Sequence, residues 1–410
     1  MTTPAAAPAH VDPEICLDFD FRRDPAIRTD PWAHFHRLAN EQPPIFYSTA
    51  LGGFWVLNRP EILAEAWTRV DLFGTEGGVN IPKVDKPFEL IPINVDPPRH
   101  RPYQQILTRE MFAPRIVDSL SEDFRAMTRD RLDALHPRGQ ADFNSEYAYV
   151  LPVEIFMTML GVPIERRTEF ADPVERVFRG TTPDGITAAI VEVAMMLDAW
   201  IDEAMKDRYA KREAHLLEAM MRAEIEGVPL SKAELSSIAT MLLLGGLDTV
   251  TSATLHHLHF LATHPEHRQQ LLDDPKLIPN AVEELLRRFG VANVARTVRQ
   301  DCEFHGVEMK EGEMVMMSTT LAGLSESAFP DALRVDFSRP RVRSRSLAFG
   351  TGIHMCSGHA LARRELLITI EEVLPRLPGL RLADGAEITY VSGGTLSIGS
   401  PLPLEWDLDA

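Results

Sequence analysis

The feature that most constrains the fold is a long apolar segment between Ser231 and Thr263. Its hydrophobic residues recur three and four positions apart, a spacing that predicts an α-helix. Ser231 and Glu234 have the spacing of a capping box at its start, and Pro265 is expected to open the next helix. A helix of roughly 30 residues spans about 45 Å, because each residue adds about 1.5 Å. We therefore expect this helix to cross the centre of the protein, with other elements packed around it.

The remaining hydrophobic pattern is also mostly helical, and shorter runs that alternate apolar and polar residues indicate strands. The expected helices cover residues 60–70, 116–135, 188–209, 280–289 and 360–374. The expected strands fall within residues 45–57, 295–317 and 388–406. The pattern predicts a mainly α fold with a minor β portion.

Composition bounds the domain organisation and the redox environment. The chain has 410 residues, of which 45% are hydrophobic, enough for a large core. Its length alone would suggest two or three domains, but no linker or internal repeat divides it. Its cysteines, Cys16, Cys302 and Cys356, are widely spaced and form no C-x-x-C pair. Neither a disulfide framework nor a tetrahedral zinc site is indicated, and this usage fits a reducing cytoplasm.

The charge and the hydropathy of the chain exclude two classes of partner. The formal net charge of -18 argues against binding to nucleic acid, whose phosphates favour Lys and Arg. Residues 1–10 lack the basic region and apolar core of a signal peptide, and no segment offers about 18 uninterrupted apolar residues. We expect a soluble protein that is not inserted in a membrane.

A polar and glycine-rich stretch interrupts the long apolar helix. Gly245 and Gly246 each cost about 1 kcal/mol relative to alanine in a helix, and Asp248 and Thr249 follow them in an otherwise apolar sequence. Two interpretations are open. The glycines could admit a neighbouring helix while Asp248 pairs with a basic side chain, or the segment could have a catalytic role.

Cys356 lies in a glycine-rich run from Phe349 to Gly358, directly before the helical pattern of residues 360–374. Glycines allow a tight turn that brings backbone N–H groups toward the sulfur, and the start of a helix also favours a thiolate. A buried structural cysteine in a turn is the alternative. A cysteine nucleophile with His354 as its base is a further alternative, but residues so close in one loop rarely have the geometry for it.

The run F-x-x-G-x-x-x-C-x-G, with Phe349, Gly352, Cys356 and Gly358 at its fixed positions, resembles the haem-ligand loop of the cytochrome P450 superfamily. The resemblance implies the P450 fold, with haem b bound between the long central helix and this loop. Cys356 would be the axial ligand of the haem iron. The residues implied in haem binding are Cys356, His354, Arg296, His100, Phe349 and Gly350; among them, His354, Arg296 and His100 resemble residues that bind the haem propionates.

Two further motifs match the same family. Asp248 and Thr249 resemble its acid–alcohol pair, in which Asp248 would relay protons from solvent and Thr249 would hydrogen-bond the oxygen substrate. Glu284 and Arg287 match the E-x-x-R pair, with Arg334 as the expected third partner. These three residues would be structural and would shape the chain that leads to Cys356.

The resemblance covers about residues 24–406 and is closest to the bacterial camphor 5-monooxygenase branch. We expect a flexible segment over residues 1–23 and one catalytic domain over residues 24–410. That branch holds its ketone substrate by a tyrosine, and Phe88 stands at the tyrosine's position, so this hydrogen bond is missing. The expected pocket wall is almost entirely apolar and consists of Phe88, Ile91, Met241, Leu244, Gly245, Val291, Thr395 and Leu396. A small hydrophobic substrate, a terpenoid or a norisoprenoid such as an ionone, would be held mainly by shape.

Gln104 and Ser357 depart from the family pattern. Gln104 stands where the family commonly has an arginine that touches a haem propionate and the redox partner, and Ser357 replaces a larger apolar residue. The cysteine loop is preceded by four arginines at alternate positions, namely Arg339, Arg341, Arg343 and Arg345. They are either a solvated extended segment or a basic patch on which an acidic ferredoxin docks.

The resemblance implies a monooxygenase that inserts one oxygen atom of O2 into a C–H bond and reduces the other to water. Two electrons would arrive singly from a two-iron two-sulfur ferredoxin and its NADH-dependent reductase, since no flavin or ferredoxin domain is fused to this chain. A haem-thiolate sensor or carrier without turnover is the alternative. The pair Asp248 and Thr249 argues against it, because ligand binding alone needs no directed proton delivery.

Overall fold

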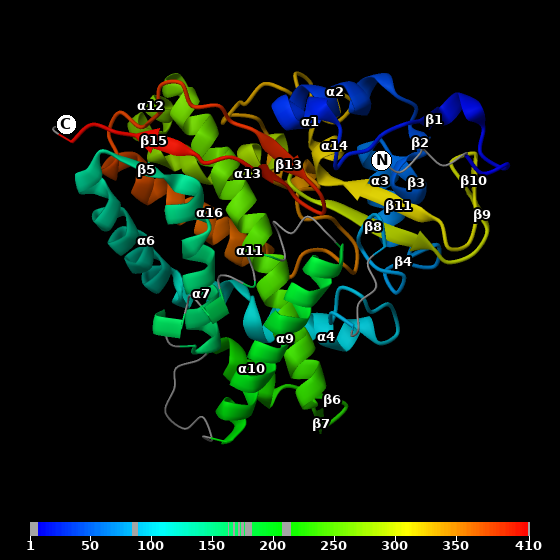
Figure 1. Ribbon diagram of the computed structural model, residues 1–410, viewed down its shortest axis with the longest axis horizontal. Coiled ribbons are helices and arrows are strands. Elements are labelled where there is room, and N and C mark those ends of the chain that lie inside the picture. Colours follow the sequence, from blue (N-terminus) through cyan, green and yellow to red (C-terminus); the bar gives the residue numbers. More distant parts are fainter. Residues whose placement is uncertain are drawn as a thin grey trace.

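The protein is described by a computed structural model over residues 7–83, 89–162, 164–166, 169–170, 173, 176, 183–206 and 215–408. Helices make up most of it, and a six-stranded sheet lies to one side of them (Figure 1). The long helix α11 (Lys232–Thr263) runs through the middle of the helical part. The prediction of a mainly α fold with a minor β portion is confirmed.

Helix α11 begins and ends where its sequence predicts. The Ser231 hydroxyl accepts from the Glu234 N–H, and the Glu234 carboxylate accepts from the Ser231 N–H at 2.7 Å. The helix ends at Thr263, and α12 (Pro265–Asp273) follows with proline in its first turn. By length and composition α11 could cross a membrane, but 67% of its most apolar window is buried inside the protein, as expected for a core helix.

Helices that pack directly on α11 include α7 (Val150–Leu160), α9 (Pro183–Lys206) and α16 (His359–Arg376). Both α6 (Ser121–Leu135) and α13 (Ile278–Arg288) pack against α16. The helix expected over residues 116–135 is in fact two, because α5 (Pro114–Ser119) ends at Leu120 before α6 begins. Further α-helices in the described part of the chain are α1 (Pro25–Thr29), α2 (Pro31–Glu41), α3 (Pro60–Thr68), α4 (His100–Ile106), α10 (His215–Arg222), α14 (Thr319–Gly323) and α15 (Val342–Arg345).

The six-stranded sheet carries one candidate functional residue, Arg296, on an inner strand. Its order is β1 (Cys16–Leu17), β2 (Ile45–Ser48), β3 (Phe54–Leu57), β11 (Met314–Ser318), β8 (Asn293–Val298) and β4 (Phe73–Gly74). Strand β11 is parallel to β3 and antiparallel to β8, and Val315 lies opposite both Trp55 and Arg296. Arg296 therefore stands on an inner strand, where neighbouring strands fix its backbone on both sides.

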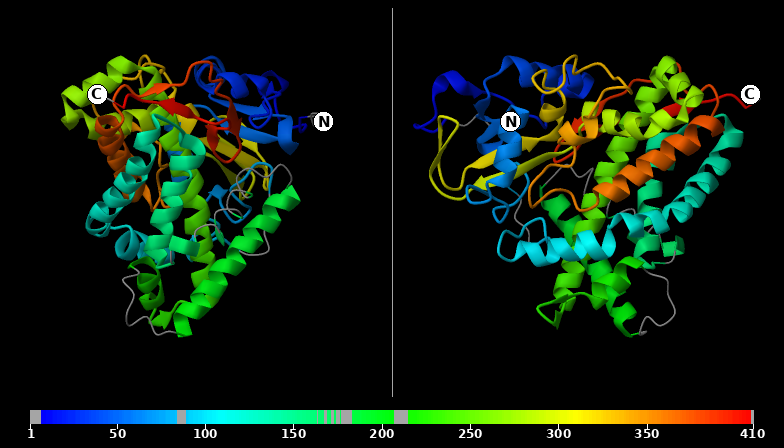
Figure 2. Two further views of the ribbon diagram at one scale, coloured as in Figure 1. Left: turned by 60° about the vertical axis from the view of Figure 1, so that its left-hand side comes forward. Right: turned by 180° about the vertical axis from the view of Figure 1, so that it is seen from behind.

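The fold also contains smaller sheets (Figure 2). They are the hairpins β9 (Cys302–Phe304) with β10 (Val307–Met309), β13 (Tyr390–Ser392) with β14 (Leu396–Ile398), and β6 (Glu224–Ile225) with β7 (Val228–Pro229), and a sheet in the order β12 (Arg381–Leu382), β15 (Pro403–Glu405) and β5 (Gln140–Asp142). The three segments predicted as strands all contain strands.

The expected boundary at residue 24 is wrong. Strand β1 pairs in parallel with β2, so residues before 24 belong to the six-stranded sheet. Phe19 and Phe21 are 3% and 1% exposed and pack with Phe54 and other aromatic rings of the core. Burial of two aromatic side chains anchors this segment, because such side chains gain the most from leaving water.

Candidate functional site

The loop around Cys356 is a series of turns that closes directly before α16. The Met355 N–H donates to the Gly352 carbonyl at 3.2 Å, and the Cys356 N–H donates to the Phe349 carbonyl at 3.0 Å. Gly352 has φ +74°, and a side chain there would put its Cβ 2.6 Å from the carbonyl oxygen of Trp67 in α3. Glycine is required at this position, because only glycine allows both this φ and this close approach.

Electrostatic effects on the Cys356 sulfur oppose one another. Desolvation by the surrounding protein raises the pKa of the thiol, although Cys356 is exposed, while the Gly358 N–H and the positive charge of Arg363 act to lower it. The guanidinium of Arg363 also lies over the Phe349 ring, 4.4 Å from its centroid, and so fixes the aromatic side of the loop. A thiol with a raised pKa becomes a thiolate when a metal cation binds it, because the cation supplies the compensating charge.

Two buried basic side chains lie near this loop, and both can bind an anionic group. Arg296 is 5% exposed, and among the described residues its guanidinium donates to the carbonyl of Ala295 alone, at 2.8 Å. Burial lowers the pKa of Arg296 to about 10, and it stays charged at neutral pH. His100 is 2% exposed, and its buried Nε2 has no hydrogen-bond partner among the residues that the structure describes. An unpaired buried nitrogen is costly and fits a site that a ligand completes.

His354 joins the cysteine loop to a buried carboxylate. Its Nε2 lies 3.0 Å from Asp96 Oδ1, and its ring meets the His100 ring edge to face at 4.2 Å between centroids. Burial would raise the pKa of Asp96, but hydrogen bonds from His354 and from the N–H and hydroxyl of Thr75 lower it to about 2. The carboxylate therefore stays ionised and holds the His354 ring in one orientation.

The structure thus brings together three of the predicted haem-binding residues, His100, His354 and Arg296, around Asp96. Burial, together with the neighbouring His354 and Arg296, lowers the pKa of His100 to about 4. A neutral imidazole and a buried guanidinium are suitable donors for carboxylates. With the Cys356 sulfur as a soft ligand for iron, this set of donors fits a haem and its two propionates.

Helix α11 exposes its glycines. Gly245 and Gly246 are exposed although most of this helix is buried, and a Cβ would meet only the Met241 sulfur at 3.9 Å from Gly245 and nothing within 4 Å from Gly246. These distances exclude the interpretation that the glycines admit a neighbouring helix. The Thr249 hydroxyl donates to the Gly245 carbonyl at 2.8 Å, and Thr249 and Asp248 are half-buried one turn beyond it.

The E-x-x-R pair is present, but its third member is Arg339 and not Arg334. Arg287 donates to both carboxylate oxygens of Glu284, at 3.0 and 2.7 Å, and Arg339 Nε donates to the same carboxylate at 3.1 Å. Arg334 contributes only its carbonyl oxygen, which accepts from Arg287 and Arg339, and its side chain is exposed. Arg334 therefore takes part in the cluster through its backbone, and its side chain lies outside the cluster.

The four arginines before the cysteine loop do not form one extended stripe. Residues 342–345 form the short helix α15, and Arg339 points inward to Glu284. Arg345 donates to the Ala328 carbonyl, and its guanidinium lies 5.3 Å from the centroid of the Phe329 ring. Arg341, Arg343 and Arg345 are the exposed members, and the side chain of Arg343 is 69% exposed and lies 3.5 Å from Glu283.

The residues predicted for the pocket wall differ in burial. Met241, Leu244, Val291 and Thr395 are half-buried, as residues beside an opening would be, and Ile91 is buried with its N–H on the Ser237 hydroxyl. Phe88 lies outside the described residues.

Leu396 is buried as well, at 0% exposed, and is part of the hydrophobic core.

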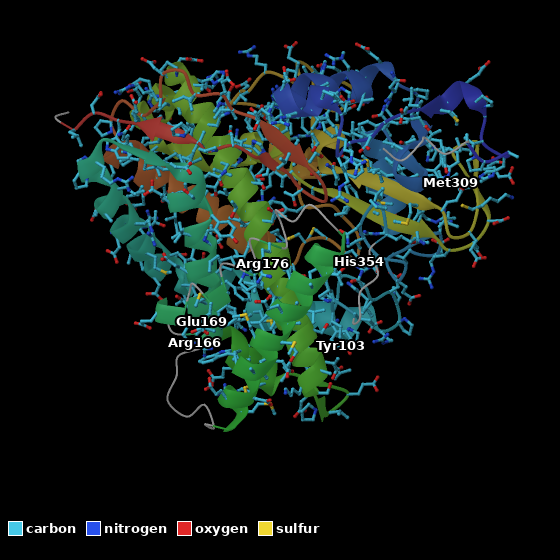
Figure 3. The ribbon with its side chains drawn as sticks, in the orientation of Figure 1. Tyr103, Arg166, Glu169, Arg176, Met309 and His354 are labelled. Carbon is cyan, nitrogen blue, oxygen red and sulfur yellow. The ribbon has the colours of Figure 1, made fainter. Side chains whose placement is uncertain are left out.

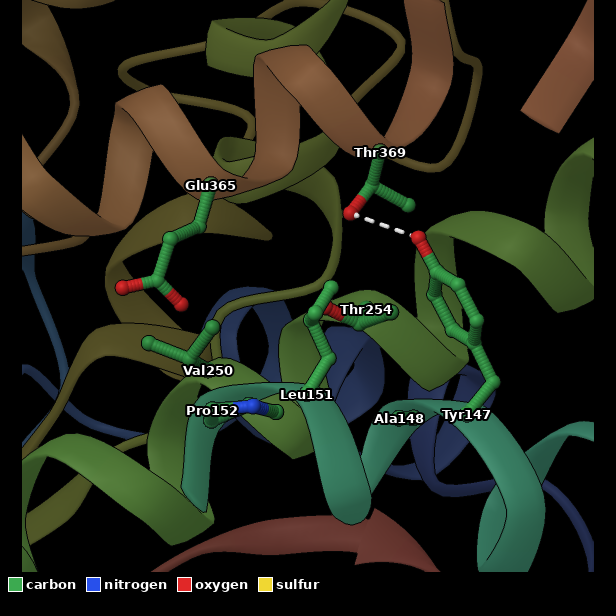
Figure 4. A pocket seen from close by; sticks show the side chains of 8 residues that line it. All are labelled: Tyr147, Ala148, Leu151, Pro152, Val250, Thr254, Glu365 and Thr369. Carbon is green, nitrogen blue, oxygen red and sulfur yellow. Dashed lines mark hydrogen bonds between the residues drawn. The ribbon is translucent and has the colours of Figure 1, made fainter. Parts of the chain in front are cut away.

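A small cavity lies elsewhere, between α7, α11 and α16, and holds a buried acid (Figure 4). Its volume is about 10 Å³, room for about one water molecule. It is lined by Tyr147, Ala148, Leu151, Pro152, Val250, Thr254, Glu365 and Thr369, none of which belongs to the predicted pocket. Burial raises the pKa of Glu365 to about 8.

Sequence reasoning missed Glu365, Asp96 and Arg339. Glu365 could have been noticed as a carboxylate among buried apolar positions of α16, between the cysteine loop and Leu366. Asp96 stands directly before two prolines and four positions before His100, and its closeness to a predicted haem-binding residue is the signal that could have found it. No local signal distinguishes Arg339 from Arg334, because only the tertiary fold decides which guanidinium reaches Glu284.

Comparison with known proteins indicates the same class of protein as the residues of the site. Residues 164–378 match the family model described as cytochrome P450. The steroid C26-monooxygenase of Mycolicibacterium smegmatis is 31% identical over 370 residues, covering 87% of this chain and 90% of that protein. A probable cytochrome P450 127A1 of Sinorhizobium fredii is 29% identical over 409 residues, 97% of this chain and 96% of the relative.

Two solved structures extend the likeness to three dimensions. The crystal structure of cytochrome P450 CYP101C1 superposes with a TM-score of 0.88 at 28% identity, and that of CYP101J2 with 0.89 at 28%. Each comparison covers 98% of this chain and 100% of the other. The cysteine loop, the buried basic pair and the central helix define a haem-thiolate protein. The chain belongs to the cytochrome P450 family, in its bacterial camphor-monooxygenase-like branch, and it is a monooxygenase that uses haem b.

Proposed function

We propose that this monooxygenase hydroxylates a small hydrophobic molecule, a terpenoid or a norisoprenoid such as an ionone, with O2 and two electrons from a two-iron two-sulfur ferredoxin. One observation carries the proposal. In the buried helix α11, Gly245 and Gly246 expose backbone with open space beside them, and the half-buried apolar side chains of Met241 and Leu244 adjoin them. An apolar opening with few polar groups selects a substrate by shape more than by hydrogen bonds.

Each functional residue has a role that follows from its position. Cys356 would hold the haem from the loop, and Arg296, His100 and His354 would hold its carboxylates. When bound, the haem supplies the activation of oxygen. Thr249 would keep its hydroxyl beside the oxygen substrate, anchored by its bond to the Gly245 carbonyl. Asp248, on the adjacent position of α11, would carry protons inward from solvent.

The substrate class is tested by binding spectra. Purified holoprotein is titrated with small terpenoids and ionones, and the Soret band is followed for the change from low-spin to high-spin haem that accompanies displacement of the axial water. We expect the strongest change from apolar molecules without a hydrogen-bonding requirement. Equal or stronger responses from large polar compounds would contradict the proposed substrate class.

The electron donor is proposed from the surface around the cysteine loop. Arg341 and Arg343 are exposed on α15 and just before it, where an acidic ferredoxin could approach the haem side of the loop. An NADH-dependent reductase would supply the ferredoxin. Replacing both arginines by glutamine should slow ferredoxin-supported turnover and weaken its dependence on salt, because fewer charges steer the encounter. Unchanged rates and an unchanged salt dependence would remove these arginines from the docking site.

A haem-thiolate sensor or carrier is the alternative that the experiments must separate. The reduced, CO-bound protein should show a Soret band shifted far to the red, which indicates thiolate ligation in both cases. Only the monooxygenase forms hydroxylated product in step with NADH consumption when ferredoxin and reductase are added.

The free cysteines of the chain also support our proposal that it works in the reducing cytoplasm.

A further inference from the structure

The side chain of Gln104 in α4 contacts the residues on both sides of Cys356. Its Oε1 accepts a hydrogen bond from the Ser357 hydroxyl at 2.9 Å. Its Nε2 donates to the carbonyl oxygen of Met355 at 3.3 Å. One amide therefore joins the residue before the cysteine and the residue after it.

These two bonds require one orientation of the amide. If the amide were turned over, its oxygen would face the Met355 carbonyl, and two acceptors would oppose each other. The Ser357 hydroxyl has a single hydrogen, and its donation to Gln104 means that this hydrogen is not available to the neighbouring Cys356 sulfur. Gln104 thus controls both the position of the loop and the hydrogen-bond donors around the sulfur.

Helix α4, which carries Gln104, is itself held in place by side-chain hydrogen bonds. The hydroxyl of Tyr103, the preceding residue, donates to Glu234 in the capping box of α11 (Figure 3). The Thr108 hydroxyl donates to the Gln104 carbonyl at 2.8 Å. By contrast, Met355 is 39% exposed, so packing does little to hold the loop at this point. Within the described part of the chain, Gln104 provides the side-chain hydrogen bonds that reach residues 355–357 from outside the loop.

We propose that Gln104 is a positioning residue, which through Met355 and Ser357 fixes the Cys356 sulfur and keeps the Ser357 hydroxyl directed away from it. This inference rests on the proposed role of Cys356 as haem ligand. Hydrogen bonds to a ligating sulfur and the mobility of its loop both change the reduction potential of the metal and the stability of its thiolate ligation. Loss of the amide should therefore alter the haem spectrum and potential while the fold persists.

The test compares Gln104→Leu with Gln105→Leu in the holoprotein. Gln105 is the next residue of α4, is also half-buried, and makes no side-chain hydrogen bond to the described residues, so it is a matched control. The readouts are the midpoint potential of the haem iron and the rate at which the reduced, CO-bound protein loses its red-shifted Soret band. We expect Gln104→Leu to lose this band about 2- to 10-fold faster, the factor that one or two hydrogen bonds supply, and to shift the potential. Gln105→Leu should match the wild type.

Variants of Ser357 keep the test independent of Gln104. Ser357→Ala should shift the potential and accelerate loss of the band, whereas Ser357→Thr keeps the hydroxyl and should behave as the wild type. Because both residues serve one interaction, the double variant Gln104→Leu with Ser357→Ala should show less than the sum of the two single effects. Thermal midpoints measured in parallel should change little.

The outcomes separate this inference from the proposed function. If the wild type shows the red-shifted band and Gln104→Leu has the same potential and rate as Gln105→Leu, the positioning role is refuted while the function stands. Additive effects of Gln104→Leu and Ser357→Ala would refute it as well. If the wild type itself shows no red-shifted band, the role of Cys356 fails and this inference fails with it.

Discussion

Glu365 gives the sharpest test of the electrostatics inside this fold. Its side chain is enclosed between α16 and α11 beside Thr254 and Thr369, and no cation among the described residues pairs with it (Figure 4). Burial raises its pKa from 4.5 to about 8, so it is protonated in the folded protein at neutral pH. In the unfolded chain the same carboxyl is ionised above its ordinary pKa.

The sign and size of the effect on stability follow from this difference. Between pH 4.5 and 8 the folded state binds the proton and the unfolded state does not, so stability falls as the pH rises through this window. At pH 7 the cost is about 3 kcal/mol, because pH 7 lies roughly 2.5 above the unfolded pKa and each unit is worth about 1.36 kcal/mol. At pH 5 the cost is below about 1 kcal/mol.

The perturbation is Glu365→Gln, which keeps the shape and removes the titration. The advantage of this variant in free energy of unfolding should grow by about 2–3 kcal/mol between pH 5 and pH 7. In a chain of this length that corresponds to a gain of about 3 °C in thermal midpoint, measured on the holoprotein at both pH values. A difference in free energy of unfolding between variant and wild type that does not change with pH would refute the reasoning.

Glu372, two turns further along α16, is the matched control. Hydrogen bonds from Arg129 and Arg125 overcome its burial and lower the pKa of its carboxyl. Glu372→Gln should therefore reduce stability by a similar amount at pH 5 and pH 7, because this carboxyl is ionised in the folded state at both.

Three other predictions follow from the site. Arg339→Ala should cost about 3 kcal/mol in urea unfolding, because it removes a partner from a buried carboxylate, whereas Arg334→Ala should cost less than about 0.5 kcal/mol; the reverse ranking would restore Arg334 as the third partner. Gly352→Ala should lower the thermal midpoint and haem retention far more than Gly312→Ala, since both glycines have positive φ but only the former has a carbonyl oxygen where the Cβ would go. Thr249→Ala should still consume O2 but release it as hydrogen peroxide, and tight coupling of NADH to product in this variant would end the proposed role of its hydroxyl.

Local sequence patterns predicted the elements that are stabilised locally. The capping box at Ser231 fixes the start of α11 within one turn, and the positive φ of Gly352 belongs to the cysteine loop itself, although the close approach of Trp67 also requires glycine there. For the same reason the strands and most helices lie where their periodicity predicts. In each case the residues that carry the signal are also the residues that form the contact.

Contacts between distant segments were not predictable in the same way. In the sequence, nothing distinguishes Phe19 and Phe21 from other residues of the N-terminal segment. Only in the folded protein do the aromatic rings of the core surround them. The choice of Arg339 as partner of Glu284 depends on how the chain turns between residues 331 and 341, where Asp331 and Arg341 both have positive φ. The bonds of Gln104 to either side of Cys356 join residues about 250 positions apart, beyond any local pattern.

The exposed glycines of α11 also show what the protein gives up in stability. Alanine at Gly246 would meet no atom within 4 Å, and it would favour the helix by about 1 kcal/mol. The fold itself would therefore accept a methyl group here and become more stable. Because this methyl group is absent, the middle of the longest helix is less stable than it could be. Under the proposed function, this turn of the helix is less stable because its open backbone serves catalysis. Efforts to stabilise this enzyme should begin away from that turn, and efforts to reshape its substrate range should begin at it.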